Sequence, residues 1–80
     1  MTVDIKVPEV GPNVTEATIV KWCKEVNDPI QESEVLVEIM TDKVNTEIES
    51  PVSGIVVEIL YPKDTVVKIG EVIARIEEKG

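Results

Sequence analysis

The chain lacks most of the side chains that carry enzyme chemistry. It has no His and a single Cys, Cys23, so it cannot build a zinc finger, a Ser-His-Asp triad or a Cys-His nucleophile. A lone Cys also excludes an internal disulfide. No pair of titratable groups stands out as an acid and a base, which makes a hidden enzyme the weakest hypothesis. Any chemistry would have to come from a group that is added to the protein.

Basic residues are scarce as well, and long apolar runs are missing. Sixteen Asp and Glu against eight Lys and Arg give a net charge of −8, which repels phosphate backbones. No apolar run approaches the length that spans a bilayer, and no signal-peptide pattern opens the sequence. We therefore expect no nucleic acid and no membrane among the partners.

The residues that are abundant favour β structure. The 80 residues include 15 Val and 10 Ile but only two Leu, two Ala and no Phe. β-branched side chains fit a pleated surface better than a helix. Five Pro and four Gly supply turns between strands. At this length the composition predicts an all-β fold, a small sandwich or flattened barrel in one domain.

Apolar alternation and turn residues together predict the strands, and no segment has a convincing helical period. Within residues 34–40, simple alternation places Leu36 on the face opposite Val35 and Val37. In the second strand it places Trp22 beside Val20, and we expect Trp22 in the core. Extended segments are expected at residues 3–7, 17–24, 34–40, 46–48, 55–60 and 71–76, with a short apolar step at Ile30.

An internal repeat emerges when the sequence is compared with itself at an offset of 37 residues. Apolar identities are easily obtained by chance in a chain so rich in Val and Ile, so the turns carry the argument. The turn residues 27–28 fall on 64–65, and Ser33 falls on Gly70. This register predicts two similar halves of about four strands each, related by a pseudo-twofold axis.

The segment that joins the two halves contains Lys43. Alternating strands flank it, so we expect Lys43 at the tip of a hairpin that begins with Asp42, a favoured turn residue. Most lysines are simply solvated surface charges. Lys43 differs from the other six because a rigid tip would hold its amine away from the rest of the protein.

The residues around Lys43 form an ordered set of motifs. Asp42-Lys43-Val44 is followed by the acidic and apolar segment 47–49 and then by Ser50-Pro51-Val52-Ser53-Gly54. The opening segment 6–11, residues 19–22 and residues 70–74 also fit, in order and without gaps. The whole set resembles the lipoyl domains of 2-oxo acid dehydrogenase complexes. Gly11-Pro12-Asn13 departs from the family, which usually has a second glycine there, in a loop that the resemblance places near the modified tip. Asn27 and Asp64 replace turn glycines with residues that tolerate a left-handed backbone.

This resemblance implies a fold, a cofactor and a site. The fold would be a flattened barrel of two four-stranded antiparallel sheets, with the domain at residues 1–77 and a C-terminal linker starting at 78–80. Lys43 would carry lipoic acid in amide linkage, and Asp42 and Val44 would be recognition neighbours read by lipoylating enzymes. Metal ligands and catalytic residues are not expected. Glu38, Glu47 and Glu49 would add an acidic flank for partners, or they would simply form a solvated strand face.

The resemblance also implies a role and a set of partners. The domain would be the non-catalytic carrier of a dihydrolipoyl acyltransferase component. Lipoyl-Lys43 would be reductively acylated by a thiamin-dependent 2-oxo acid decarboxylase, would deliver the acyl group to coenzyme A at a separate acyltransferase catalytic domain, and would be reoxidised by dihydrolipoyl dehydrogenase. The compartment would be the bacterial cytoplasm or the mitochondrial matrix. Pyruvate, 2-oxoglutarate and branched-chain acids all remain open as substrates.

Two other interpretations compete with this one. A biotin carrier domain resembles the same fold, but it usually has Met on both sides of the lysine, where this chain has Asp42 and Val44. An unmodified β module that acts only as an interaction adaptor would need no particular tip residue. Cys23 is expected to be inert, because the lipoyl group would bring its own two sulfurs.

Overall fold

The computed structural model describes residues 1–42 and 44–79, and the described residues form strands, turns and loops. No helix that could cross a membrane occurs among them. The eight strands are β1 (Thr2–Lys6), β2 (Glu16–Trp22), β3 (Pro29–Ile30), β4 (Val35–Met40), β5 (Asn45–Glu49), β6 (Gly54–Ile59), β7 (Val66–Lys68) and β8 (Val72–Glu78).

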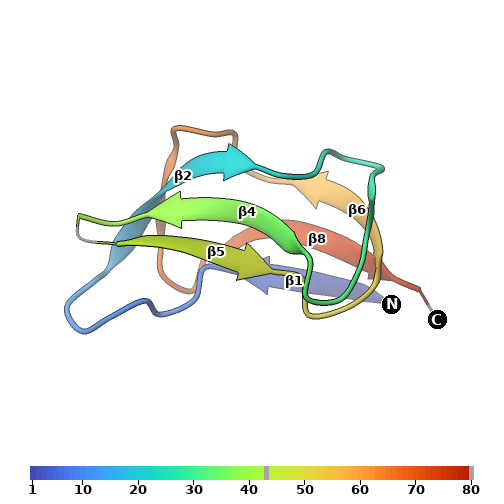
Figure 1. Cartoon of the computed structure of the whole chain (residues 1–80), viewed down its shortest axis with the longest axis horizontal. Helices are drawn as coiled ribbons and strands as arrows, with labels where there is room; N and C mark the ends of the chain where they lie inside the picture. Colours follow the sequence, from blue (N-terminus) through green and yellow to red (C-terminus); the bar gives the residue numbers. More distant parts are fainter. Residues whose placement is uncertain (43, 80) are drawn as a thin grey trace.

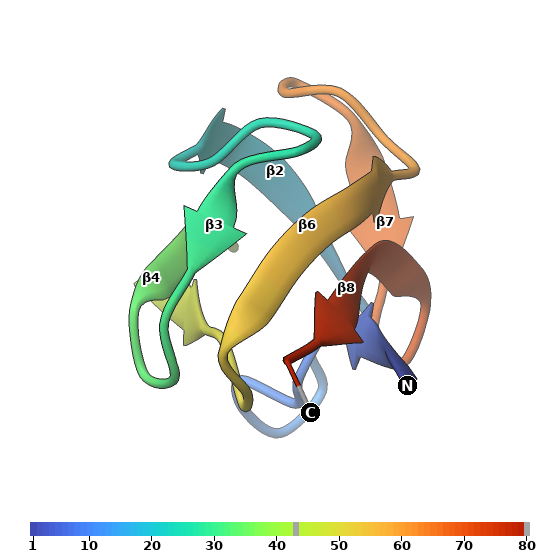
Figure 2. The same ribbon diagram turned by 90° about the vertical axis from the view of Figure 1, so that its right-hand side faces the viewer.

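The strands form two antiparallel sheets that pack face to face. One sheet has the order β1-β8-β6-β3 and the other has the order β5-β4-β2-β7. The molecule is elongated, with extents of 37 × 21 × 17 Å. Figure 1 shows the connection between β4 and β5 at one end and both chain termini at the opposite end. Figure 2, viewed along the long direction, shows the strands of the two sheets enclosing the interior between them. The predicted all-β fold of two four-stranded sheets is confirmed.

The two halves of the chain have the same topology. The strand order of one sheet becomes that of the other when β1 is exchanged with β5, β2 with β6, β3 with β7 and β4 with β8. Each sheet therefore contains two strands from each half, and neither half can complete a sheet alone. This is the pseudo-twofold arrangement that the repeat at an offset of 37 predicted.

Left-handed turn residues recur at the same offset. Asn27 has a φ of 78° and Asp64 a φ of 68°, whereas Ser33 has a φ of 71° and Gly70 a φ of 87°. Asn and Asp adopt this region more readily than other non-glycine residues, so the replacement of turn glycines at 27 and 64 preserves the backbone. Ser33 has no such preference and carries a conformational cost that Gly70 avoids.

The turns at 27–28 and 64–65 bind the opposite half of the chain. The Asn27 N–H donates to the Val56 carbonyl at 2.6 Å, and the Val56 N–H donates to the Asp28 carbonyl at 2.9 Å. In the other half, the Asp64 N–H donates to the Ile19 carbonyl at 2.7 Å, and the Ile19 N–H donates to the Thr65 carbonyl at 2.9 Å. Each half therefore supplies a turn that satisfies the backbone of a strand in the other half.

Four β-bulges also lie in pairs that are 37 residues apart, and they show that two predictions were wrong. The ladders skip one residue at Val20, Leu36, Val57 and Ile73. An extra residue reverses the alternation beyond it. Leu36 and Val37 are consequently both buried, so the prediction that they lie on opposite faces was wrong. Val20 is 40% exposed, so its assignment to the same face as Trp22 was wrong as well.

The core is aliphatic. Its members come from both sheets and from both halves: Ile5, Val7, Ala17, Ile19, Ile30, Leu36, Val37, Ile39, Ile48, Val56, Val67, Ile73, Ala74 and Ile76. Trp22, which we expected in the core, is half-buried and packs against this cluster from its rim. Its indole N–H donates to the Tyr61 carbonyl at 2.9 Å, so the polar end of the ring has a partner at the edge.

The motif Ser50-Pro51-Val52-Ser53-Gly54 has structural roles at both ends. Ser50 is buried, and its hydroxyl donates to the Val52 carbonyl at 2.5 Å and so closes the turn after β5. Gly54 lies between β3 and β8, where a Cβ atom would come within 2.0 Å of the Glu77 carbonyl oxygen. Only glycine permits that approach of two backbones.

Two carboxylates at equivalent positions close equivalent turns. Glu34 accepts from the Gln31 N–H at 2.9 Å, and Glu71 accepts from the Lys68 N–H at 3.0 Å. The bond from Lys24 and then that from Gln31 hold the pKa of Glu34 below its ordinary value of 4.5. The pKa of Glu71 is lowered first by the Lys68 N–H and then by the Tyr61 hydroxyl, which raises the pKa of Tyr61 in turn. Lys24 and Tyr61 are themselves one repeat apart.

We predict opposite effects of reciprocal substitutions at the equivalent positions 33 and 70. Ser33→Gly should stabilise the fold by about 1 kcal/mol, since it removes the cost of a left-handed serine. Gly70→Ser should destabilise it by about 1 kcal/mol, because the space around Gly70 is open and only the φ of 87° opposes a side chain. Urea denaturation of the two variants and the wild type measures both effects. Equal effects of the same sign would contradict the assignment.

We predict that acid removes part of the stability through Glu34 and Glu71. A carboxyl with a lowered pKa stabilises the folded state fully above its ordinary value of 4.5 and loses that contribution as the pH falls through the folded pKa. The double variant Glu34→Gln with Glu71→Gln should therefore lose less stability than the wild type between about pH 7 and about pH 3.

Chemical denaturation at a series of pH values measures this difference. The matched control is Glu32→Gln, because Glu32 bonds Ser53 through its backbone N–H rather than through its carboxylate. The control should follow the wild type. A double variant that is as acid-sensitive as the wild type would show that the two turn carboxylates do not govern the acid response.

Candidate functional site

The connection between β4 and β5 is held closed by hydrogen bonds on both sides of its tip. Ile39 pairs with Thr46 and Met40 with Asn45, so residues 41–44 form the connection. The Thr41 N–H donates to the Val44 carbonyl at 2.8 Å, and the Val44 N–H donates to the Thr41 hydroxyl at 3.4 Å. Hydrogen bonds between Thr41 and Val44 thus close the described part of the hairpin.

The three predicted site residues are consecutive in this connection. Asp42 is exposed, and Val44 is 46% exposed. Lys43, the predicted attachment residue, lies outside the described residues. The bonds across the turn come from Thr41 rather than from the Asp42 carboxylate, among the residues that the structure describes. Asp42 and Val44 are therefore the exposed neighbours of position 43 in the sequence, and Val44 also closes the turn through its backbone N–H and carbonyl.

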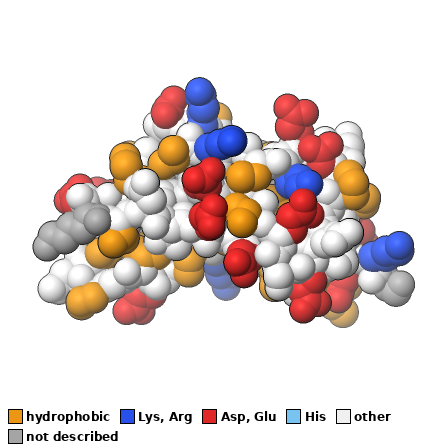
Figure 3. Space-filling view, in the orientation of Figure 1, with side chains coloured by type: hydrophobic (Ala, Val, Ile, Leu, Met, Phe, Trp, Pro, Cys, Tyr) orange, Lys and Arg blue, Asp and Glu red, His pale blue; other side chains and the backbone are white. Residues whose placement is uncertain are grey.

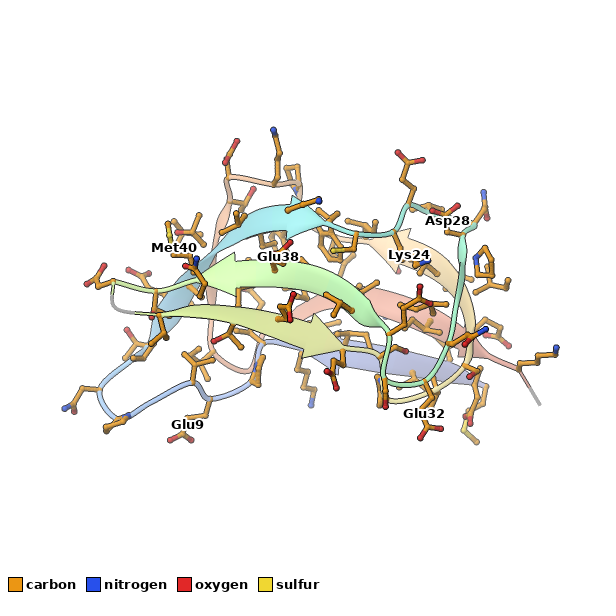
Figure 4. All side chains as sticks on the ribbon, in the orientation of Figure 1. Glu9, Lys24, Asp28, Glu32, Glu38 and Met40 are labelled. Carbon is orange, nitrogen blue, oxygen red and sulfur yellow. The ribbon has the colours of Figure 1, made fainter. Side chains whose placement is uncertain are left out.

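A groove lies beside the hairpin. The loop between β1 and β2 forms one side of it, and the hairpin forms the other. Figure 4 shows Met40 at the hairpin end of β4 and Glu9 on the nearby loop that follows β1. Residues from four segments line the groove: 10–18 from the loop and β2, Met40 from β4, 41, 42 and 44 from the hairpin, and Val66 from β7.

The central residue of the charged rung differs in sign between the two sheets. In one sheet, Arg75 lies between Asp4 and Glu58 and bonds both, at 3.0 Å and 2.6 Å. At the equivalent rung of the other sheet, Glu38 lies between Lys21 and Glu47. Two acidic side chains opposite each other are mutually unfavourable. The strands that lead to the hairpin therefore carry excess negative charge.

The remaining candidates of the sequence analysis lie apart from the hairpin. Cys23 is free and exposed just after β2, at the end of that strand remote from its pairing with Met40. No group of three or more Cys, Asp or Glu side chains suited to a metal ion is found in residues 1–42 and 44–79. The described geometry thus leaves the β4–β5 hairpin and its groove as the candidate site.

Comparison with known proteins identifies relatives over almost the whole chain. The family described as "Biotin-requiring enzyme" matches residues 3–76. The chain is 53% identical, over 91% of its length, to the dihydrolipoyllysine-residue acetyltransferase component of the pyruvate dehydrogenase complex of Corynebacterium glutamicum. It is 40% identical, over 94% of its length, to the dihydrolipoyllysine-residue succinyltransferase component of the 2-oxoglutarate dehydrogenase complex of Staphylococcus saprophyticus.

A solved structure matches at the level of the fold. The solution structure of the lipoyl domain of the 2-oxoglutarate dehydrogenase complex from Azotobacter vinelandii superposes with a TM-score of 0.81 at 29% identity, covering 98% of this chain and 99% of that one. The two curated relatives are much longer: the chain spans 11% of the first and 18% of the second. With the family matched over residues 3–76, the chain belongs to the biotin/lipoyl family of cofactor-bearing domains.

Proposed function

We propose that this chain is a lipoyl carrier domain of the acyltransferase component of a 2-oxo acid dehydrogenase complex. Lys43 is the residue that carries lipoic acid in amide linkage, and the domain has no catalytic activity of its own. The observation that carries the proposal is the placement of Asp42 and Val44: they flank position 43 on an exposed, hydrogen-bonded hairpin. The relatives that share this region are named for a dihydrolipoyllysine residue.

The residues around position 43 fit an attached lipoyl group. A lysine side chain supplies the amine for the amide bond, and its neighbours Asp42 and Val44 are exposed to a modifying enzyme. The adjacent groove includes apolar side chains that suit a hydrocarbon chain. When bound, the lipoyl group supplies a disulfide that accepts electrons and an acyl group. The protein contributes a stiff scaffold, an aliphatic core and a fixed hairpin.

Biotin is the alternative cofactor, since the matched family covers both groups. Met40 is the only Met near the tip, and it pairs with Asn45 in the ladder rather than flanking position 43. The curated relatives also name a dihydrolipoyllysine residue and not a biotinyl one. Both observations favour lipoic acid.

The partners follow from the carrier role. A thiamin-dependent decarboxylase component, an acyltransferase catalytic domain, dihydrolipoyl dehydrogenase and a lipoylating enzyme must each reach Lys43. The net charge of −8 and the acidic rung at Glu38 and Glu47 favour brief, electrostatically steered encounters. The relatives are bacterial, which supports the bacterial cytoplasm as the compartment. In this proposal the linker starts at residues 78–80. Glu78, the first of these residues, is also the last residue of β8.

We predict that co-expression with a lipoylating system adds one lipoyl group, and that peptide mapping by mass spectrometry locates it at Lys43. Lys43→Arg should abolish the addition. Lys63→Gln is the matched control, because Lys63 is an exposed lysine next to an acidic turn residue, Asp64. The control should be lipoylated fully. Modification at another lysine, or addition of biotin instead, would overturn the proposal.

We predict that the position of the lysine within the hairpin is itself recognised. The double variant Lys43→Val with Val44→Lys keeps the composition of the turn but moves the amine by one residue, which redirects the side chain. Lipoylation should be lost, while the circular dichroism spectrum and the unfolding transition stay those of the wild type. Full lipoylation of this double variant in the intact-mass spectrum would instead show that a lysine near this turn is enough for lipoylation, whatever its exact position.

A further inference from the structure

The paired ends of β4 and β5 have an equivalent at the opposite end of the molecule, where β8 pairs with β1. The Thr41 N–H donates to the Val44 carbonyl at 2.8 Å, and the Glu78 N–H donates to the Met1 carbonyl at 2.8 Å. In the described chain, however, no turn joins β8 to β1. The sheets therefore bring these backbone groups together without the help of a connection.

The side chain of Thr41 adds a bridge that is absent at the opposite end. Its hydroxyl donates to the Val44 carbonyl at 3.3 Å and accepts from the Val44 N–H at 3.4 Å. In a regular hairpin the two residues that flank the loop exchange two backbone bonds. Here the Val44 N–H bonds the hydroxyl instead of the Thr41 carbonyl. At the equivalent position, the Glu78 side chain has no hydrogen bond with Met1 among the described residues, so the bridge comes from the choice of residue 41 and not from the fold.

This bridge distinguishes the hairpin from other turns of the molecule. The turns that end at Asp28, Glu34 and Glu71 are closed by a carboxylate, which accepts from an N–H three residues earlier. Acidic and hydrophobic side chains are intermixed on the visible face from the hairpin end to the opposite end (Figure 3). The described part of this face thus offers no patch of one kind that marks the hairpin. The conformation of the connection is left as a feature that a modifying enzyme can recognise.

We propose that Thr41 is a positioning residue for the lipoylation of Lys43, because its hydroxyl holds the β4–β5 connection in the conformation that a lipoylating enzyme binds. The inference rests on the proposed attachment at Lys43. In that reaction the lysine amine attacks the carbonyl carbon of an activated lipoyl group, an acyl adenylate. The amide C–N bond forms, the bond from the carbonyl carbon to the phosphate oxygen breaks, and AMP and a proton leave. Thr41 takes no part in these bond changes; it reduces the conformational freedom that the connection loses on binding.

The kinetics of lipoylation test this role with the variants Thr41→Val and Thr41→Ser. Valine keeps the β-branched shape of threonine without its hydroxyl, and serine keeps the hydroxyl. Initial rates are measured by intact mass with a lipoylating enzyme, the adenylate and a series of domain concentrations. Thr41→Val should raise KM about threefold and leave kcat unchanged, since a binding conformation that is populated less weakens the apparent affinity. Threefold corresponds to about 0.7 kcal/mol, a small effect because both hydroxyl bonds are long. Thr41→Ser should keep KM close to that of the wild type.

Thr46→Val is the matched control on the same hairpin. Thr46 pairs with Ile39 in the ladder, and its hydroxyl takes part in none of the hydrogen bonds of the described residues. This control should have the KM of the wild type. In NMR spectra, the Val44 amide should exchange with water faster in Thr41→Val than in the wild type or in Thr41→Ser. The urea midpoint of Thr41→Val should be unchanged, because the ladders alone place the strand ends.

Several results would overturn the inference alone: an unchanged KM in Thr41→Val, a fall in kcat at constant KM, a serine variant as impaired as the valine variant, or an equal rise of KM in Thr46→Val. A lowered urea midpoint in Thr41→Val would show that Thr41 serves the fold rather than the attachment, and would overturn it as well. Absence of lipoylation in the wild type would instead overturn the proposed function, and this inference with it.

Discussion

The exchange of backbone hydrogen bonds between the two halves is the constraint on which the rest of the structure depends. A left-handed turn at Asn27 satisfies the Val56 backbone, and an equivalent turn at Asp64 satisfies the Ile19 backbone. Both recipient residues are fully buried, so neither strand could leave these groups unpaired at low cost. Since each half completes the other, the domain folds as one unit despite its small aliphatic core. The chain needs no disulfide or metal to join the sheets.

The same constraint explains which features could be predicted from the sequence. Turns leave strong local signals, and the matches of Asn27 with Asp64 and of Ser33 with Gly70 reveal the repeat from the sequence alone. The two-sheet fold followed from the repeat and from the resemblance around Lys43. The faces that simple alternation predicted for Leu36 and Val20 were wrong, because a bulge inserts a residue without changing the local composition. Nothing in the segment 34–40 distinguishes a bulged strand from a regular one.

Part of the candidate site could likewise be predicted from the sequence, and part of it could not. Asp42 and Val44 were predicted from a contiguous motif, and the structure places both on the exposed hairpin. The groove brings together Val14, Met40 and Val66, which are distant in sequence. Met40 and Val66 come together because β4 and β7 both pair with β2, and Val14 comes from the loop that precedes β2. A sequence pattern that is read along one strand at a time contains no information about such a rung.

The poverty of reactive side chains is consistent with the role of a carrier. The chain has no His and one exposed Cys, and in the proposed role the acyl and redox chemistry would come from the attached group. The connection between β4 and β5 lies at the end of the long axis opposite both termini (Figure 1). The acidic surface adds long-range steering to this display.

Reductive acylation tests the central claim most directly. The lipoylated domain is incubated with a purified thiamin-dependent pyruvate decarboxylase component and pyruvate, and its intact mass is followed with the Lys43→Arg variant in parallel. The same assay is run with 2-oxoglutarate and with branched-chain 2-oxo acids and their decarboxylase components. We expect one of the three types to add one acyl group and one hydrogen to the domain, on the Lys43 peptide alone. A lipoylated domain that accepts no acyl group from any of the three decarboxylase types would contradict it.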